Sequence, residues 1–171
     1  MQLFVPADFV VPLRVEHPQF ILRPLLISDV VKDYDAVMTS VDHLKGIFGP
    51  TSDWPSANLS LEQDLIDLGW HHKEFQRRTS FAYTMLDADE NQCLGCAYIY
   101  PSVYDGYDAE AYCWVRASRV DELDQPLFDT FKSWLHNSWP FESVIFPGRE
   151  PTWAQLKRDR MTVSPFENML Q

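Results

Sequence analysis

Three apolar runs close together in the middle of the chain restrict its fold more than any other feature of the sequence. Phe81–Leu86, Cys93–Tyr100 and Ala109–Val115 each have the length of a strand. A polar stretch at Asp87–Asn91 separates the first two runs, and an Asp-Gly pair precedes the third. The sequence therefore predicts a hairpin and a third strand directly after it, within one sheet.

Helical patterns lie on both sides of these strands. Ser28 is a suitable N-cap for a helix over 29–41, and Ser60 with Gln63 forms the capping box of a second helix. Pro126 suits the first turn of a third helix. The stripes predicted to be buried are Val30, Tyr34, Val37, Met38 and Val41 in the first helix, Leu61, Leu65, Leu68, His72 and Phe75 in the second, and Leu127, Phe131, Trp134, Leu135 and Ser138 in the third.

The remaining predicted elements are strands at Phe20–Leu25 and Ser143–Phe146 and a last helix over 152–160. The order β-α-α-β-β-β-α-β-α predicts an α+β fold with a central sheet, in a single domain over residues 20–171. Residues 1–19 are punctuated by prolines. They are predicted to be an N-terminal arm, with an edge strand over Phe9–Val15 as the alternative.

The composition argues against several classes of protein. Hydrophobic residues make up 46% of the 171 residues, which is enough for a packed core and argues against disorder. With 14 Lys and Arg against 25 Asp and Glu, the net charge is −11. We therefore expect no nucleic-acid partner and no docking on anionic membranes. No apolar run approaches the roughly 20 residues of a membrane span.

Two further features bear on location and assembly. The first residues show no signal-peptide pattern, and three cysteines are too few for a disulfide framework, so a cytoplasmic location is expected. Six Trp, seven Tyr and eleven Phe are more than a core of this size has to bury, which makes a homodimer a further expectation.

Cys93 and Cys96 form a Cys-x-x-Cys pair, which is a redox or zinc motif when it lies at a turn or a helix start. Here the pair lies within a predicted strand, where positions three apart face opposite sides of the sheet. The sequence therefore predicts two buried thiols too far apart for a disulfide, and no metal site. His71 and His72 do not share a helix face, so they give no metal pair.

The order of the elements and several short segments resemble the GNAT acyltransferase superfamily. These segments are "FILRPL" followed by "SDV" at the first strand and helix, "CLGCAYIYP" at the third strand, "AYCWVR" and "LFDTFKSWL" at the fourth strand and third helix, and "SVIFPG" at the fifth strand. The resemblance implies a mixed central sheet flanked by helices in three α/β/α layers. It also implies an N-acetyltransferase that moves an acetyl group from acetyl-CoA to an amine, with a small molecule or a peptide as acceptor.

In that family the coenzyme lies where the fourth and fifth strands splay apart, and its amides pair with exposed backbone of the fourth strand. Its pyrophosphate binds free N–H groups at the start of the next helix, where the helix dipole also favours an anion. Carried onto this chain, the resemblance places the coenzyme on Trp114 and Val115. Its phosphates would lie on the loop 116–125, beside Arg116 and Arg119.

This loop, "RASRVDELDQP", departs from the family pattern, which is basic and rich in glycine so that the backbone can approach the phosphates. It has no glycine, and it carries Asp121, Glu122 and Asp124. A charge pair about 5 Å apart at an effective dielectric of about 20 is worth roughly 3 kcal/mol, against about 0.3–1 kcal/mol from the helix dipole. Two interpretations stay open: the coenzyme binds through Arg116 and Arg119, or the protein is a non-catalytic module that binds a ligand or a protein.

Acyl transfer to an amine needs a base for the amine proton and benefits from an acid for the leaving thiolate. Glu110 is the candidate base, because its place in the strand resembles one where some GNAT enzymes hold a carboxylate; the alternative is a solvent-facing strand residue. The acid in that family is often a tyrosine just after the fifth strand, where this chain has Trp153. Tyr112 is the candidate acid, with Tyr83 and Tyr98 as alternatives.

The loop 45–58 lies where GNAT proteins shape the acceptor site. Phe48, Trp54 and Asp53 are candidates for receiving an amine through cation–π and charge contacts. The alternative is a loop that its aromatic residues pack on the sheet. A basic cluster near the C-terminus either meets the coenzyme's ribose phosphate or is a solvated helix face; its residues are Arg149, Lys157, Arg158 and Arg160.

Overall fold

A six-stranded sheet organises the protein, and its strands follow one another in sequence order. The computed structural model describes residues 3–158. The strands are β1 (Val15–His17), β2 (Phe20–Pro24), β3 (Phe81–Leu86), β4 (Cys93–Pro101), β5 (Ala109–Val115) and β6 (Val144–Ile145). Neighbouring strands are antiparallel except β5 and β6, which are parallel, so the predicted mixed sheet is confirmed.

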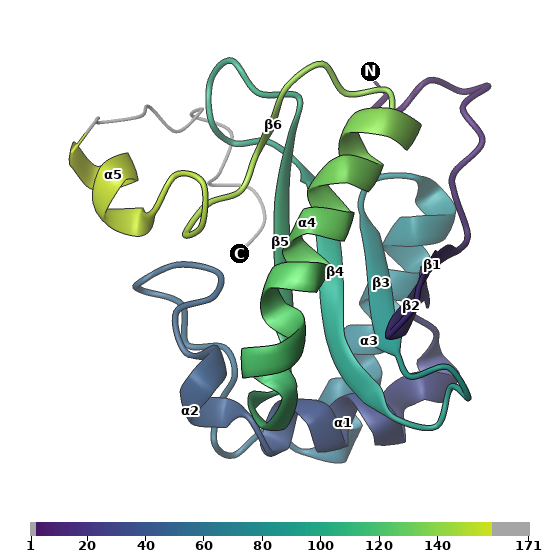
Figure 1. The fold of residues 1–171 in the computed structure, drawn as a ribbon, viewed down its shortest axis with the longest axis vertical. Helices are drawn as coiled ribbons and strands as arrows, with labels where there is room; N and C mark the ends of the chain where they lie inside the picture. The colour runs from purple at the N-terminus through teal and green to yellow at the C-terminus, as the bar shows by residue number, and fades with distance from the viewer. Residues whose placement is uncertain (1–2, 159–171) are drawn as a thin grey trace.

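Helices cover both faces of the sheet, as the three-layer prediction requires. They are α1 (Val30–Met38), α2 (Val41–Leu44), α3 (Leu61–Arg77), α4 (Val120–Ser138) and α5 (Trp153–Arg158), with short 3-10 helices η1 (Ile27–Asp29) and η2 (Ala117–Arg119). Figure 1 shows α4 lying across one face of β4 and β5, α3 behind the sheet, and α1 near the lower ends of the strands. Residues of α1 and α3 share the core layer on the face away from α4. Within the described part of the chain, no helix is long and apolar enough to cross a membrane.

Alternation along the strands divides the core into two layers. On β5, Ala111 and Cys113 face the core beneath α4, whereas Tyr112 and Trp114 belong to the core beneath α1 and α3. The N-terminal segment packs on the α4 side, where Val5 is buried and the Tyr83 hydroxyl donates to a backbone carbonyl of that segment, at 2.7 Å. Successive residues of β5 therefore pack in opposite layers of the core, and Tyr112 and Trp114 are on the side of α1 and α3.

Several local predictions agree with the structure. The Ser60 hydroxyl accepts a hydrogen bond from the Gln63 N–H at 3.1 Å, so α3 begins at its predicted cap. An Asp87 carboxylate oxygen accepts the N–H groups of Asn91 and Gln92, at 2.7 and 3.0 Å, which closes the predicted hairpin turn. These features depend on neighbouring residues alone, so the sequence was sufficient to find them.

The helix starts differ from the predictions. Ser28 lies inside η1 rather than at an N-cap, and a carboxylate oxygen of Asp29 accepts the Leu26 N–H at 2.9 Å instead. α4 begins at Val120, so Pro126 lies inside this helix and not in its first turn. The reason is that acidic residues at positions 121 and 122 already suit the positive end of the helix, so it can start before the proline.

The predicted buried face of α3 is confirmed at Leu68 and Phe75 and is wrong in the first two turns of the helix. Leu61 and Leu65 are 45% and 40% exposed, whereas Asp64 and Leu68 are buried. The helix is rotated so that Asp64, Leu68 and His71 face the sheet, and polar groups replace two of the predicted apolar ones. This rotation has a functional meaning, because these side chains line a cavity.

The ends of the chain complete the comparison with the sequence. The edge strand β1 begins at Val15, where the predicted strand over Phe9–Val15 ends, and it pairs with β2. The predicted last helix is present as α5, and residues 159 and 160 of the prediction lie outside the described residues.

Candidate functional site

Two cavities lie along β5, and both are lined by Tyr112. The larger, of about 540 Å³, lies between the sheet and the helices α1 and α3. The smaller, of about 270 Å³, lies where β5 and β6 separate. We call the larger cavity the acidic pocket and the smaller one the splay.

The acidic pocket combines carboxylates with aromatic rings. Its carboxylates are Asp33 of α1, Asp64 and Asp67 of α3, and Glu110 of β5. Aromatic side chains form much of the remaining wall: Phe48, Trp54, Trp70, Tyr98, Tyr100 and Tyr112. Such a wall suits an organic cation, because carboxylates attract its charge and ring faces accept it. Phe48 and Trp54 lie where the acceptor prediction placed them, but Asp53 is exposed and does not line the pocket.

Asp33 and Asp64 are the most deeply placed of these carboxylates, 5% and 3% exposed. Burial, followed by the charge of Asp64, raises the pKa of Asp33 to about 7. Burial, followed by the charge of Asp67, raises the pKa of Asp64 to about 6. Burial lowers the pKa of His71, so this neighbour favours its neutral form and adds little positive charge.

The sequence reasoning missed these two aspartates, although a signal was present. Asp33 lies between Val30 and Val37 on the apolar stripe of α1, and Asp64 lies between Leu61 and Leu68 in the same way. A carboxylate in the middle of an apolar stripe is a candidate site residue, because burying an isolated charge is expensive.

Glu110 and Tyr112, the predicted base and acid, lie side by side on the pocket face of β5. The Tyr112 hydroxyl donates to one Glu110 oxygen at 3.2 Å, and the Val103 N–H donates to the other, also at 3.2 Å. Glu110 is only 8% exposed, so it is not a solvent-facing strand residue. Burial and then the Glu110 charge raise the pKa of Tyr112 above its ordinary value, which keeps its hydroxyl protonated and able to donate.

The alternative tyrosines have other positions. Tyr98 lines the pocket, and its hydroxyl accepts the Trp114 indole N–H at 3.1 Å. Tyr83 belongs to the core on the opposite face of the sheet, so it cannot serve this pocket.

The splay exists because β6 pairs with β5 over only two residues. Ala109 pairs with Val144 and Glu110 with Ile145, after which Phe146 forms a bridge with Glu150 instead. Residues of β5 beyond Glu110 therefore leave backbone groups at the edge of the sheet. This is the position at which the family resemblance places the coenzyme.

Side chains of the protein occupy part of the splay. The Arg149 guanidinium donates to both carboxylate oxygens of Asp124, at 2.6 and 2.9 Å, and to the Cys113 carbonyl oxygen at 3.1 Å. Trp153 donates its indole N–H to the Gly46 carbonyl at 3.1 Å, and both residues line the splay. The Cys113 carbonyl is one of the backbone groups that a coenzyme amide could use, and Arg149 holds it.

The predicted phosphate ligands lie elsewhere. Arg116 is buried and donates to Asp35 at 3.0 Å and to the Cys93 carbonyl at 3.0 Å, so it faces α1. Arg119 pairs with Glu122 at 3.0 Å. Neither arginine lines the splay. The reason is that α4 already begins at Val120, so the predicted loop over residues 116–125 is shorter than expected. Its first residue, Arg116, is bound to Asp35 of α1.

The two other predicted cofactor residues remain at the splay or beside it. Trp114 lines the splay. The Val115 carbonyl contacts His43 Nε2 at 3.1 Å, so this backbone group already has a partner. Of the basic cluster, Arg149 lies at the splay, and Arg160 lies outside the described residues.

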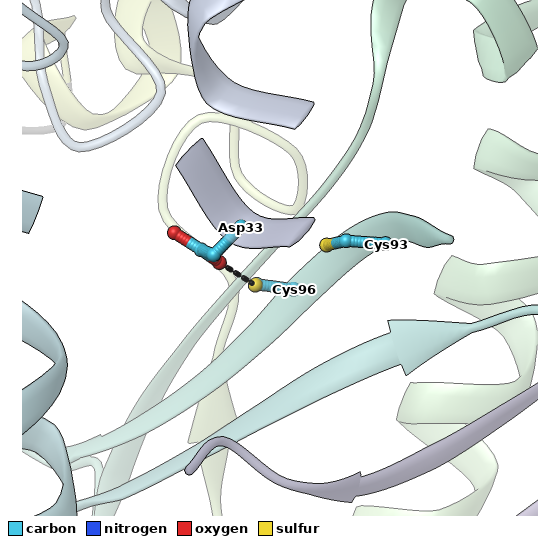
Figure 2. A group of neighbouring side chains, drawn as sticks. All are labelled: Asp33, Cys93 and Cys96. Atoms are coloured by element: carbon cyan, nitrogen blue, oxygen red, sulfur yellow. Dashed lines mark hydrogen bonds between the residues drawn. The ribbon is translucent and has the colours of Figure 1, made fainter. Parts of the chain in front are cut away.

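A β-bulge brings Cys93 and Cys96 together, which corrects the prediction that they face opposite sides. Leu86 pairs with Cys93 and Met85 with Gly95, so Leu94 is the extra residue and the alternation reverses there. Figure 2 shows both thiols and Asp33 grouped at one end of β4. A Cβ on Gly95 would lie 2.0 Å from the Trp114 carbonyl oxygen, so only glycine fits beside β5 here.

The ligand atoms of Asp33, Cys93 and Cys96 lie within 4.8 Å of one another. Structural zinc takes four ligands, and this group offers three. The Cys96 thiol donates a hydrogen bond to Asp33 at 3.4 Å (Figure 2). The Cys93 thiol donates to the Gly95 backbone carbonyl at 3.3 Å. These bonds give both thiols an acceptor within the protein.

Comparison with solved structures decides the fold. The ribosomal-protein-S5-alanine acetyltransferase from Vibrio fischeri has a TM-score of 0.59 at 13% identity, over 72% of this chain and 67% of that one. The fold is that of the GNAT acetyltransferases. A spermidine N-acetyltransferase from Vibrio cholerae, in complex with coenzyme A and spermine, has a TM-score of 0.56 at 12% identity, over 84% and 80% of the two chains.

A ribosomal L7/L12 α-N-protein acetyltransferase in complex with coenzyme A has a TM-score of 0.57 at 15% identity, over 71% and 67% of the chains. No family model and no curated protein sequence matches this chain. The GNAT fold therefore stands on the structure, while the activity has to be argued from the site.

Proposed function

We propose that the protein is an acyltransferase that moves an acyl group, with acetyl-CoA as the donor, onto the amine of a cationic acceptor bound in the acidic pocket. One observation carries this proposal: the acidic pocket and the splay meet at Tyr112. An acceptor in one cavity and a thioester in the other would face each other across this residue.

The residues at that junction suit the reaction. An amine arrives protonated at neutral pH, and Glu110 takes a proton from it, so that the neutral nitrogen can attack the thioester carbonyl. The new N–C bond forms as the C–S bond breaks, the Tyr112 hydroxyl gives its proton to the leaving sulfur, and the acylated nitrogen loses its second proton to solvent water. The hydrogen bond between Tyr112 and Glu110 then returns a proton from the carboxyl to the tyrosine.

Donor entry requires a rearrangement at the splay. Arg149 has to leave Asp124 and the Cys113 carbonyl before a coenzyme amide can pair with that strand. Once released, its guanidinium is a cation at the splay that can meet a phosphate. This role would replace the one that the family resemblance implies for Arg116 and Arg119.

The test combines binding with turnover. Acetyl-CoA is titrated into the protein by calorimetry, and release of free thiol is then followed with a panel of primary amines. Saturable binding and amine-dependent thiol release are the expected results. Binding of an amine without any thiol release, at millimolar acetyl-CoA, would contradict the proposal.

A second candidate function is a non-catalytic module that binds a cationic ligand. The observation that favours it is the contact of Arg149 with Asp124 and Cys113, which closes part of the splay from within. The two candidates share the acidic pocket and differ only in whether a thioester enters beside it. Calorimetry with acetyl-CoA therefore separates them.

Location and assembly remain part of the same proposal. The three cysteines are free thiols, which suits the reducing cytoplasm. For a homodimer, the supporting feature is a group of exposed apolar residues on α1 and α3; its members are Val31, Leu61, Leu65, Ile66 and Trp70. Light scattering of the purified protein would measure its mass in solution.

A further inference from the structure

We infer that Asp33, Cys93 and Cys96 bind a zinc ion beside the acidic pocket, with Asp64 next to its fourth coordination position. The ligands come from α1 and β4, and their ligand atoms lie within 4.8 Å of one another. The sequence argued against a metal because positions 93 and 96 of a regular strand face opposite sides, and the bulge in β4 removes that objection. The site is separate from the thioester and the amine of the proposed reaction, and its existence does not depend on that reaction.

The distances among the ligand atoms are close to those of a tetrahedral site. Zinc–sulfur bonds of about 2.3 Å and zinc–oxygen bonds of about 2.1 Å place a sulfur and an oxygen about 3.6 Å apart, and two sulfurs about 3.8 Å apart. Cys96 Sγ and Asp33 Oδ1 are 3.4 Å apart, which is close to the first value (Figure 2). Because Cys93 Sγ lies within 4.8 Å of both atoms, movements of about 1 Å or less complete the arrangement.

The backbone that carries the two thiols is held firmly by its neighbours. β4 bulges at Leu94, and Gly95 lies so close to the Trp114 carbonyl oxygen that no side chain fits between them. The buried Thr84 hydroxyl donates a hydrogen bond to Cys93 Sγ at 3.6 Å. A donor of this kind orients a thiolate ligand and stabilises its charge. The ligands are therefore largely positioned before a metal arrives.

The charges around the site favour a divalent cation. Among the residues that the structure describes, no Lys, Arg or His forms an ion pair with Asp33 or Asp64. These two carboxyl groups hydrogen-bond each other when one of them is protonated; when both are ionised, Oδ2 of Asp64 is buried with no donor to satisfy it. A water on the fourth position of the metal is such a donor. Two thiolates and one carboxylate leave bound zinc with one net negative charge, as in a Cys₃His site.

The acidic pocket provides the route to the site. Asp33 and Asp64 line this pocket of about 540 Å³, whereas Cys93 and Cys96 are 1% and 0% exposed. Burial, followed by the neighbouring Cys93, raises the pKa of Cys96, so this thiol is protonated in the metal-free protein and metal binding releases its proton. Thiolate ligands favour zinc over magnesium and calcium, which prefer oxygen ligands.

The test titrates the reduced, chelator-treated protein with Co²⁺, and Zn²⁺ is then added to displace it. We expect one Co²⁺ per chain, with thiolate-to-cobalt charge-transfer absorption and the visible absorption of a tetrahedral site, and a Kd for Zn²⁺ below about 1 μM. Cys93→Ser and Cys96→Ser should each lower the affinity at least about 100-fold, because each removes a ligand. Asp64→Asn should lower it by about tenfold, since Asp64 acts through the bound water.

The matched control is Cys113→Ser, which removes a buried free thiol from the core layer beneath α4 and should leave the affinity and the spectrum unchanged. Thermal denaturation without metal checks that each variant is folded. Three results would overturn the inference: no binding at micromolar metal, bound Co²⁺ without charge-transfer absorption in the unaltered protein, or equal losses of affinity in Cys96→Ser and Cys113→Ser. Because the readout is metal binding, a lack of acyl transfer would count only against the proposed function.

Discussion

The two cavities along β5 differ in how their charged groups are satisfied. In the splay, Arg149 and Asp124 pair with each other, so the protein supplies both charges. In the acidic pocket, Asp33 and Asp64 have no basic partner among the described residues. The pocket therefore gains a missing contact when a cation binds, whereas the splay must exchange an existing contact for a ligand. In the proposed reaction, the acceptor would enter the acidic pocket without breaking an ion pair, whereas the donor would have to displace one in the splay.

The largest expected effect tests the junction between the cavities. Glu110→Gln should lower acyl transfer at neutral pH by about 10²–10⁴-fold, because the ammonium then has no base. The remaining rate should rise about tenfold per pH unit below the amine's own pKa, since only the neutral amine reacts. Thiol release across pH 6–9 measures both effects. An unchanged rate would remove Glu110 from the mechanism and leave the pocket as a binding site only.

Tyr112→Phe is expected to have the next largest effect. It keeps the ring between the two cavities and removes the proton donor, so turnover should fall about 10–100-fold, while calorimetry shows little change in amine affinity. Tyr83→Phe is the matched control, because Tyr83 also donates one hydrogen bond but lies on the other face of the sheet. If both variants lose activity equally, the loss reflects stability rather than proton transfer.

The unpaired carboxylates should make stability depend on pH. The pKa of Asp33 is raised to about 7, so between pH 4 and 7 the folded state holds a proton that the unfolded state releases. The free energy of unfolding should therefore fall as pH rises through this window. Asp29, Asp64, Asp67 and the Cys96 thiol also face this region and contribute to the profile.

In Asp33→Asn the slope should decrease, and at pH 8 the variant should be more stable than the parent by on the order of 1–3 kcal/mol. Urea denaturation at several pH values provides the measurement. A variant that is less stable than the parent at pH 8 would mean that Asp33 already has a cationic partner.

The smallest expected effect concerns the splay. Asp124→Asn weakens the hold on Arg149, so affinity for acetyl-CoA should rise by about fivefold, or roughly 1 kcal/mol. Calorimetry with acetyl-CoA measures the change, and Asp129→Asn serves as the control on the same helix. Weaker binding in Asp124→Asn would show that the pair with Arg149 organises the splay rather than closes it.

The elements that the sequence predicted well depend on neighbours in the chain. β3 and β5 begin and end at the predicted residues, because their apolar runs are bounded by polar turns. The same alternation put Glu110 and Tyr112 on one face, where they do form a hydrogen bond. Local pattern was sufficient in both cases.

The features that the sequence did not predict depend on contacts between segments that are far apart in the chain. The packing of α3 against the sheet and α1 decides which face of this helix is buried. The apolar pattern of the sequence predicted that Leu61 and Leu65 are buried, whereas Asp64 is buried instead. The bulge at Leu94 depends on how β3 and β4 pair. The partner that Arg116 finds in Asp35 is 81 positions away in the chain. No nearby pattern encodes these choices.

Gly95 gives the wall of the splay a particular vulnerability. Its missing side chain lets the Trp114 carbonyl approach, so β4 and β5 stay close at the end of β5 that has no partner in β6. A single added methyl group there would act as a wedge. It would displace Trp114, which lines the splay, although Gly95 itself lines neither cavity. The shape of the splay thus depends on a position with no functional group of its own.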